Sequence, residues 1–288
     1  MTSSLITVVS PEQDNMPNRN QNWDWKSVFV IHWRWENSKS LYQTIPSIST
    51  INLDDLLEID RQKTALVKNT KLFCEGFPAN NALLWGARGT GKSSLIHALL
   101  NYFASRGLRL IEIEKQHFKF IHSLFEDLFE LPYKFLIVCD DLSFSENDSN
   151  FMEIKSILEG SIFNSTDNIL FYVTSNRRHL VAEPLADNEL AYEQEIHTQD
   201  VFDERLSLAD RFGLWLSFHP FSQQQYLNIV HYWTNKLAEK HDVAVPCQQT
   251  LEEAAIRWVI ERRGNRSGRS AHHFSKSWIG DKLYKVLD

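Results

Sequence analysis

The sequence has few cysteines, and they are not arranged to cross-link a small fold or to hold a metal. Only Cys74, Cys139 and Cys247 occur in 288 residues, far apart and without a CxxC pair. A disulfide framework and a zinc site are therefore disfavoured, and a reducing compartment is expected. The sequence also lacks an apolar run long enough to cross a bilayer, and its start lacks the pattern of a secretory signal. We therefore expect a cytoplasmic protein that does not enter a membrane.

An excess of positive charge is also absent. The formal net charge is -7, which argues against a protein that coats nucleic acid non-specifically. Hydrophobic residues make up 43% and charged residues 23%, as in ordinary soluble globular proteins. The length suits one α/β core with appendages.

The chain begins with two segments that lie outside the expected core. Residues 1–22 are rich in Ser, Asn, Gln and Pro, which predicts a flexible tail. Residues 23–75 hold an aromatic stretch and then, from about residue 60, a linker helix with an acidic start. The rings either pack against a core or form a stacking platform for nucleic acid. Packing is favoured because few basic residues accompany them. The rings are those of Trp23, Trp25, Phe29, Trp33 and Trp35.

Residues 76–221 alternate between short apolar runs and amphipathic stretches. This alternation predicts an α/β core in which a five-stranded parallel sheet is flanked by helices. Residues 222–288 carry helical spacing and no convincing strand, so we expect a small C-terminal α-helical lid. The expected strands are 81–85, 108–113, 135–139, 169–173 and 214–218, and the expected helices are 94–104, 118–129, 151–162, 223–240, 249–262 and 271–287.

A complete phosphate-loop pattern, G-x-x-x-x-G-K-S, follows the first core strand and precedes a helix. Glycines allow backbone amides to turn inward and cradle phosphate oxygens at a helix N-terminus. Lys92 would bring positive charge to the β- and γ-phosphates, and Ser93 would offer a hydroxyl to Mg²⁺. The loop predicts a P-loop NTPase whose nucleotide contacts come from Gly86, Ala87, Arg88, Gly89, Thr90, Gly91, Lys92, Ser93 and Ser94.

A second motif supplies the acidic half of the same chemistry. The apolar run 135–139 ends on the adjacent carboxylates Asp140 and Asp141, as in a Walker-B strand. Asp140 is expected to hold Mg²⁺ with Ser93, and Asp141 to polarise the attacking water. ATP is favoured over GTP because the guanine-specific string Asn-Lys-x-Asp is absent.

These motifs and their surroundings resemble those of AAA+ ATPases. Asn176 ends the fourth core strand, where the resemblance implies a sensor-1 residue. Arg211 precedes the fifth strand, where it implies an arginine finger for a neighbouring subunit, and hence self-association. Arg269 lies in the lid, where it implies a sensor-2 arginine, with Arg266 as the competing candidate. A surface salt bridge is the alternative role for each arginine.

More narrowly, several strings resemble domain-of-unknown-function family 815, a set of predicted AAA+-type ATP-binding proteins. The strings are 78–81, 84–94, 139–144, 158–161, 174–180 and 208–215, and the resemblance extends over roughly residues 23–287. It implies a fold and a nucleotide but names no client.

Two positions depart from the common AAA+ pattern. Asp141 stands where a glutamate is usual, which withdraws the carboxylate by about one bond, and misplacement near 1 Å costs roughly a hundredfold in rate. Glu58 stands where glycine is common, beside the expected adenine pocket at 54–57. Because of Asp141, hydrolysis is expected to be slow or to depend on a partner, and Glu58 leaves the contact at the adenine pocket open.

Two charged stretches have alternative interpretations. Residues 183–204 hold acidic residues and neither Lys nor Arg, which indicates a solvated loop or, less favoured, a docking segment. The lid arginines serve nucleotide sensing or, less favoured, contact nucleic acid. They are Arg257, Arg262, Arg263, Arg266 and Arg269.

Together these features predict a Mg²⁺-dependent AAA+-type ATPase that remodels or loads a protein partner. The alternatives are a nucleotide-dependent switch with little turnover, a helicase-loader-like ATPase linked to nucleic acid, and, more weakly, a small-molecule kinase.

Overall fold

A computed structural model of the chain describes residues 24–45, 50–142, 154, 167–176, 211–245, 247–262 and 264–287. Several sequence features lie outside these residues: the tail 1–22, Trp23, nearly all of the stretch 151–162, the residues after Asn176 up to Asp210 with their acidic segment, and Arg263.

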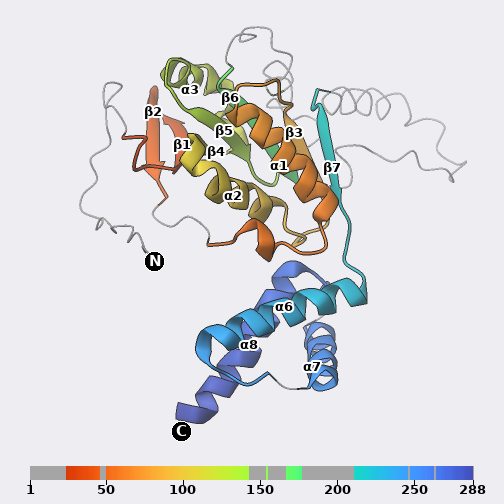
Figure 1. Ribbon diagram of the computed structural model, residues 1–288. Coiled ribbons are helices and arrows are strands. Elements are labelled where there is room, and N and C mark those ends of the chain that lie inside the picture. Colours follow the sequence, from red (N-terminus) through yellow and green to blue (C-terminus); the bar gives the residue numbers. More distant parts are fainter. Residues whose placement is uncertain are drawn as a thin grey trace, which may run out of the picture.

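The centre of the fold is one seven-stranded sheet with strand order β2-β1-β4-β5-β6-β3-β7 (Figure 1). All neighbouring strands run parallel except β1 and β2, which pair antiparallel. The strands are β1 (Val30–Glu36), β2 (Lys39–Thr44), β3 (Ala82–Gly86), β4 (Leu108–Ile113), β5 (Lys134–Cys139), β6 (Ile169–Ser175) and β7 (Leu214–Phe218).

The five expected core strands are confirmed as β3 to β7, but the prediction of a five-stranded sheet was too narrow. The aromatic stretch adds β1, which pairs with β4 from Val30 opposite Leu110, and β1 turns back into β2. Ser40 is the one buried residue of β2, so this edge strand has no apolar alternation to reveal it in the sequence.

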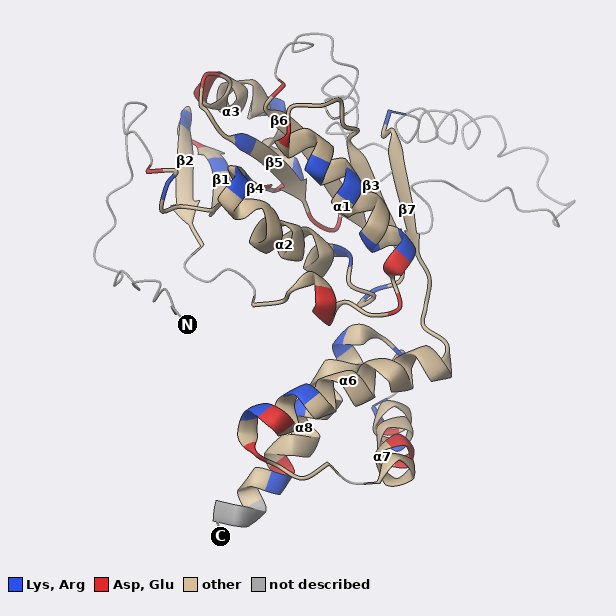
Figure 2. Ribbon diagram, in the orientation of Figure 1, with Lys and Arg blue, Asp and Glu red and all other residues tan. Residues whose placement is uncertain are grey.

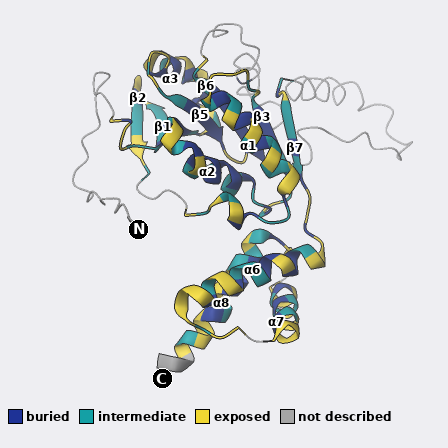
Figure 3. Cartoon of the chain, in the orientation of Figure 1, coloured by how far each residue is buried: buried dark blue, intermediate teal, exposed yellow. Residues whose placement is uncertain are grey.

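Helices cover both faces of the sheet, and a separate apolar cluster lies beneath each layer (Figures 1 and 3). Helices α1 (Asp60–Cys74) and α2 (Lys92–Phe103) pack on one face. The 3-10 helix Lys115–Phe120 and helix α3 (Ile121–Leu128) pack on the other. Because the strands β3 to β6 are parallel, their carboxyl ends meet at one edge, where the polar motifs follow them.

The aromatic stretch is part of the core rather than an exposed platform. Trp25 and Trp33 are buried, and Trp35 stacks on Phe120 with ring centroids 5.1 Å apart. For these described rings the packing interpretation is confirmed.

The chain ends in a helical bundle that follows β7. The bundle consists of α6 (Gln223–His241), α7 (Gln248–Glu261) and α8 (Gly268–Leu287), with α6 packed along α8 (Figure 1). Ser222 begins α6 as an N-cap, because its side chain accepts a hydrogen bond from Gln225 N at 3.2 Å. Within the described part of the chain, no helix is both long and apolar enough to span a membrane.

Candidate nucleotide site

The phosphate loop starts where β3 ends, against the last residue of β7. Gly86 has a φ of 126°, and a Cβ at this position would lie 2.1 Å from the Phe218 carbonyl oxygen, so no larger residue fits. Ala87 N donates to the same oxygen at 2.8 Å. The two strands therefore fix where the loop leaves the sheet.

Two further glycines shape the loop. Gly91 adopts a left-handed φ of 103° as the N-cap of α2, which directs the first amides of that helix into the loop. Gly89 has a φ of 74° and touches the start of α8: a Cβ there would lie 2.8 Å from Ser267 Oγ. Arg269 N donates to Gly89 O at 3.3 Å, so the bundle is bonded to the loop backbone. This concave, amide-lined loop fits a phosphate chain.

Lys92 lies at the centre of the loop and is only 6% exposed. Its Nζ donates to Gly86 O at 3.0 Å, Ala87 O at 2.8 Å and Asn176 Oδ1 at 2.9 Å. Burial lowers the pKa of Lys92 to about 8, against the opposing pull of the nearby Asp140 and Asp141 charges.

The carboxylates after β5 face the loop across a short gap. Ser93 Oγ donates to Asp140 Oδ1 at 2.7 Å, and Thr174 Oγ1 donates to the same oxygen. Asp141 Oδ1 accepts from Asn176 Nδ2 at 2.6 Å. A hydroxyl and carboxylate oxygens in this arrangement are the donors that Mg²⁺ prefers, so these residues fit a magnesium site.

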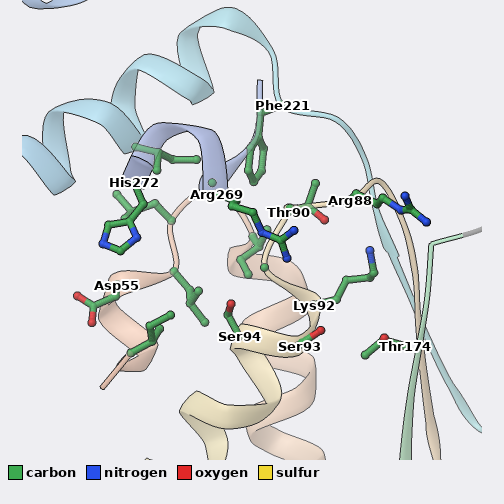
Figure 4. Close-up of a pocket in the computed structure, with 18 of the residues that line it drawn as sticks. Asp55, Arg88, Thr90, Lys92, Ser93, Ser94, Thr174, Phe221, Arg269 and His272 are labelled. Carbon is green, nitrogen blue, oxygen red and sulfur yellow. The ribbon is translucent and has the colours of Figure 1, made fainter. Parts of the chain in front are cut away.

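A cavity of about 560 Å³ joins the loop to the bundle, within the usual size range of ligand pockets. Arg269 reaches from α8 toward the loop, whereas the end of Arg88 points away from it (Figure 4). Apart from these charged and loop residues and Asp55, the lining is mainly apolar and aromatic. It includes Ile51, Leu56, Leu57, Ile59, Phe221, Ile229, Trp233 and His272.

The aromatic end of the cavity contains a close ring pair. The rings of Trp233 and His272 have centroids 4.3 Å apart. Burial lowers the pKa of His272, which favours a neutral imidazole. A pair of rings of this kind suits the face of a flat heterocycle.

Comparisons with known proteins agree with this arrangement. The family model described as "Protein of unknown function (DUF815)" matches residues 27–282. The chain belongs to this family. No curated protein matches the sequence.

Among solved structures, the DUF815 chain is similar to a point mutant of Thermotoga maritima RuvB, with 15% identity and a TM-score of 0.54 over 82% of this chain and 67% of that one. It is also similar to the T. maritima RuvB Holliday junction branch migration motor, with 16% identity and a TM-score of 0.50 over 82% of this chain and 66% of that one. The chain thus spans about two thirds of the RuvB chains that it matches. This likeness shows the fold, which is that of an AAA+-like P-loop ATPase.

Most of the site residues predicted for the DUF815 chain lie together. Gly86 and Ala87 form the start of the loop. The cavity is lined by Arg88, Gly89, Thr90, Gly91, Lys92, Ser93, Ser94, Asp140, Asp141, Asn176 and Arg269.

Arg211 is the exception. It precedes β7, whereas the loop follows the carboxyl end of the parallel strand β3. At about 3.3 Å per residue, the five residues of β7 alone separate Arg211 from the loop by about 16 Å. This arginine therefore lies at the opposite end of the sheet from its own chain's cavity.

Asp55, which lines the cavity, belongs to a polar cluster that the sequence does not reveal. The Asp55 side chain is 2% exposed and pairs with Lys236 Nζ; Tyr232 OH donates to its Oδ1 at 2.5 Å, and Asn52 N to its Oδ2 at 2.9 Å. The residues of this cluster come from segments about 180 positions apart. Their charges carry no shared motif, so only the fold reveals them.

Glu58 keeps the backbone shape that glycine favours. Its φ is 65°, in the left-handed region, and its Oε1 accepts from Asn228 Nδ2 at 2.8 Å. The neighbouring Leu57 and Ile59 line the cavity, while Glu58 does not. Glu58 in place of glycine therefore keeps the left-handed backbone conformation and places no side chain in the cavity, at a modest conformational cost.

Proposed function

We propose that this chain binds ATP with Mg²⁺ in the cavity between the phosphate loop and α8, and hydrolyses it. The observation that carries the proposal is the convergence of Lys92, Asp141 and Asn176 beside the Ser93–Asp140 pair. These groups come from three separate strands and their following loops. A glycine-rich turn that binds no ligand would not require this convergence.

The loop amides and Lys92 would bind the phosphates. Lys92 Nζ now donates to two loop carbonyls and to Asn176, so it is held where a β- or γ-phosphate oxygen would replace those carbonyl partners. Ser93 and Asp140 would hold Mg²⁺, which supplies charge neutralisation at the phosphate oxygens.

Asp141 and Asn176 would orient the attacking water. Asp141 accepts from Asn176 at 2.6 Å, so the two side chains act as one hydrogen-bonded unit at the cavity's edge. Asp141 would polarise the attacking water by accepting a hydrogen bond from it, while Asn176 would fix the position of the water. Arg269 would place positive charge near the γ-phosphate from the bundle side.

Arg211 would complete the site of a second copy of the chain. It lies at the far end of the sheet from its own cavity, which supports a role in trans and self-association. In nucleotide hydrolysis, an arginine supplied in trans raises kcat by a factor of roughly 10³–10⁵. With the AAA+-like fold, this supports an assembling ATPase that remodels or loads a protein partner.

The test is ATP turnover by the purified chain with Mg²⁺ over a series of protein concentrations. We expect turnover per chain to rise with concentration and to vanish in Lys92→Ala. Arg211→Ala should abolish the rise while leaving ATP affinity within about twofold of wild type, because Arg211 does not contact its own chain's nucleotide.

Arg269→Ala should instead weaken ATP affinity, by about 1.5–3 kcal/mol for a lost charge-assisted contact. Tight binding without turnover at any concentration would refute the ATPase proposal.

A nucleotide-dependent switch is the second candidate, favoured by the short Asp141 side chain. In this case ATP and ADP would bind, but turnover would stay negligible, and the bundle would respond to the γ-phosphate. Protease sensitivity of the chain with ATP and with ADP separates this outcome from an inactive preparation, because a switch predicts different cleavage patterns.

A nucleic-acid-linked role has less support. Trp25 and Trp33 are buried, and the Arg262 guanidinium lies over the Trp258 ring at 4.2 Å, so these groups are engaged within the chain. In the bundle, basic and acidic positions are interspersed (Figure 2). A salt-dependent DNA-binding titration tests this role, since phosphate contacts give affinity that falls steeply with salt.

A further inference from the structure

Thr174 connects β6 to the turn that carries both carboxylates. It is 1% exposed and lies two residues before Asn176. Its hydroxyl donates to Asp140 Oδ1 and accepts from Asp141 N at 2.9 Å. Its carbonyl accepts from Leu142 N at 2.8 Å. One residue therefore bonds to three consecutive residues of the neighbouring segment.

The turn at Asp141 needs such support. Asp141 has a φ of 52°, in the left-handed region that residues with a side chain adopt at a cost of order 1–2 kcal/mol. Conformations of this kind persist where the surroundings fix them, and they cluster at functional sites. The Asp141 and Leu142 amides are the groups that would turn away if the chain relaxed, and Thr174 accepts from both.

This left-handed turn changes where the carboxylate goes. It brings Asp141 Oδ1 to 2.6 Å from Asn176 Nδ2, and Asn176 in turn accepts from Lys92 at 2.9 Å. An aspartate is one methylene shorter than the glutamate usual at this position. The backbone geometry thus brings the short side chain into contact with the rest of the site.

The same hydroxyl also fixes the other carboxylate. Asp140 Oδ1 accepts from Ser93 Oγ and from Thr174 Oγ1, which approach from the loop and from β6. Two donors on one oxygen hold the plane of the carboxylate, as partners behind metal ligands commonly do. A valine at position 174 would have the same shape but could make neither bond.

We propose that Thr174 is a positioning residue whose single hydroxyl sets both carboxylates, Asp140 for Mg²⁺ and Asp141 for the attacking water. This inference rests on the proposed function. It predicts that removal of the hydroxyl impairs two separable properties: the gain in nucleotide affinity on adding Mg²⁺, through Asp140, and kcat, through Asp141.

The test compares Thr174→Val, Thr174→Ser and the wild-type chain by titration with a fluorescent ATP analogue, with Mg²⁺ and with EDTA. For Thr174→Val we expect EDTA affinity within about twofold of wild type and a Mg²⁺-dependent gain reduced about tenfold, the size of one hydrogen bond to a charged group. Its kcat should fall tenfold to a hundredfold with a smaller change in KM. Thr174→Ser should stay within about threefold of wild type in every measure.

Thr234→Val is the matched control. Thr234 is also fully buried, and its hydroxyl donates to Ser275 Oγ at 3.0 Å within the bundle. The same chemical change there should lower stability and leave the Mg²⁺-dependent gain and kcat unchanged. If Thr174→Val does not fold, as judged by circular dichroism, Thr174→Ala takes its place with the same expectations.

The inference is overturned if Thr174→Val matches wild type, if Thr174→Ser is impaired as much as Thr174→Val, or if Thr234→Val shows the same losses. If wild type binds Mg²⁺ and ATP without turnover, hydrolysis fails as a proposal, while the Mg²⁺-dependent affinities still decide the role of Thr174. If wild type binds no nucleotide, both proposals fall.

Discussion

The buried Lys92 predicts that ATP affinity depends on pH in an unusual range. Burial lowers the pKa of Lys92 to about 8 in the nucleotide-free chain. The perturbation is a change of buffer from pH 7 to pH 9. With that pKa, about 90% of Lys92 side chains carry charge at pH 7 and about 10% at pH 9.

The direction follows from which form the ligand favours. Phosphate oxygens stabilise the charged ammonium, so the pKa of Lys92 is higher in the bound state than in the free state. Full affinity is therefore present below pH 8 and is lost as the pH rises through 8. The binding-competent fraction falls about tenfold, so the apparent Kd for ATP should rise about tenfold, or about 1.4 kcal/mol, between pH 7 and pH 9.

Titration with a fluorescent ATP analogue at pH 7, 8 and 9 measures this dependence. Lys92→Arg is the control, because a guanidinium stays charged over the whole range. We expect the variant to bind ATP more weakly. Any pH dependence that it keeps comes from titration of the phosphates, whose second pKa is near 6. Equal pH dependence in both chains, or flat affinity in the wild type, would refute the reasoning.

Two further predictions concern stability. Gly86→Ala should cost at least about 3 kcal/mol in urea unfolding, because the new Cβ would lie 2.1 Å from the Phe218 carbonyl oxygen. Gly76→Ala, with a φ of 79° and open space around it, should cost only about 1–2 kcal/mol; equal losses would contradict the steric argument. A double-mutant cycle of Asp55→Asn and Lys236→Met should give a coupling free energy of about 1–2 kcal/mol. The Asp55 side chain is 2% exposed and the Lys236 side chain 44%, so this ion pair is intermediate between a buried pair and a surface pair. A coupling below about 0.5 kcal/mol would indicate a solvent-screened pair.

The parts of the fold that the sequence predicts are those whose signal is local. The core strands are short apolar runs, and the loop is a contiguous string with fixed spacing, so β3 and the residues Gly86 to Ser93 could be located directly. The bundle helices also carry their own periodicity. For these elements the residues that determine the structure are neighbours in the chain.

The missed features depend on contacts between distant residues. β2 exposes most of its side chains, so its strand character comes from pairing with β1 rather than from its own pattern. Thr174 carries no sequence signal of its role, since only the bonded geometry shows its hydroxyl on Asp140 and on the Asp141 amide. A left-handed turn at an aspartate gives only a weak compositional signal, because most aspartates adopt other conformations.

The bond between the loop and the start of α8 has a mechanical consequence. Arg269 N donates to Gly89 O, and a Cβ built at Gly268 would lie 3.4 Å from the same oxygen. Helix α8 therefore begins directly on the loop. With 20 residues, α8 is about 30 Å long. A tilt of about 10° at its loop end would displace its far end by about 5 Å. A shift of the loop backbone that tilted α8 would therefore be larger at the far end of this helix than at the loop.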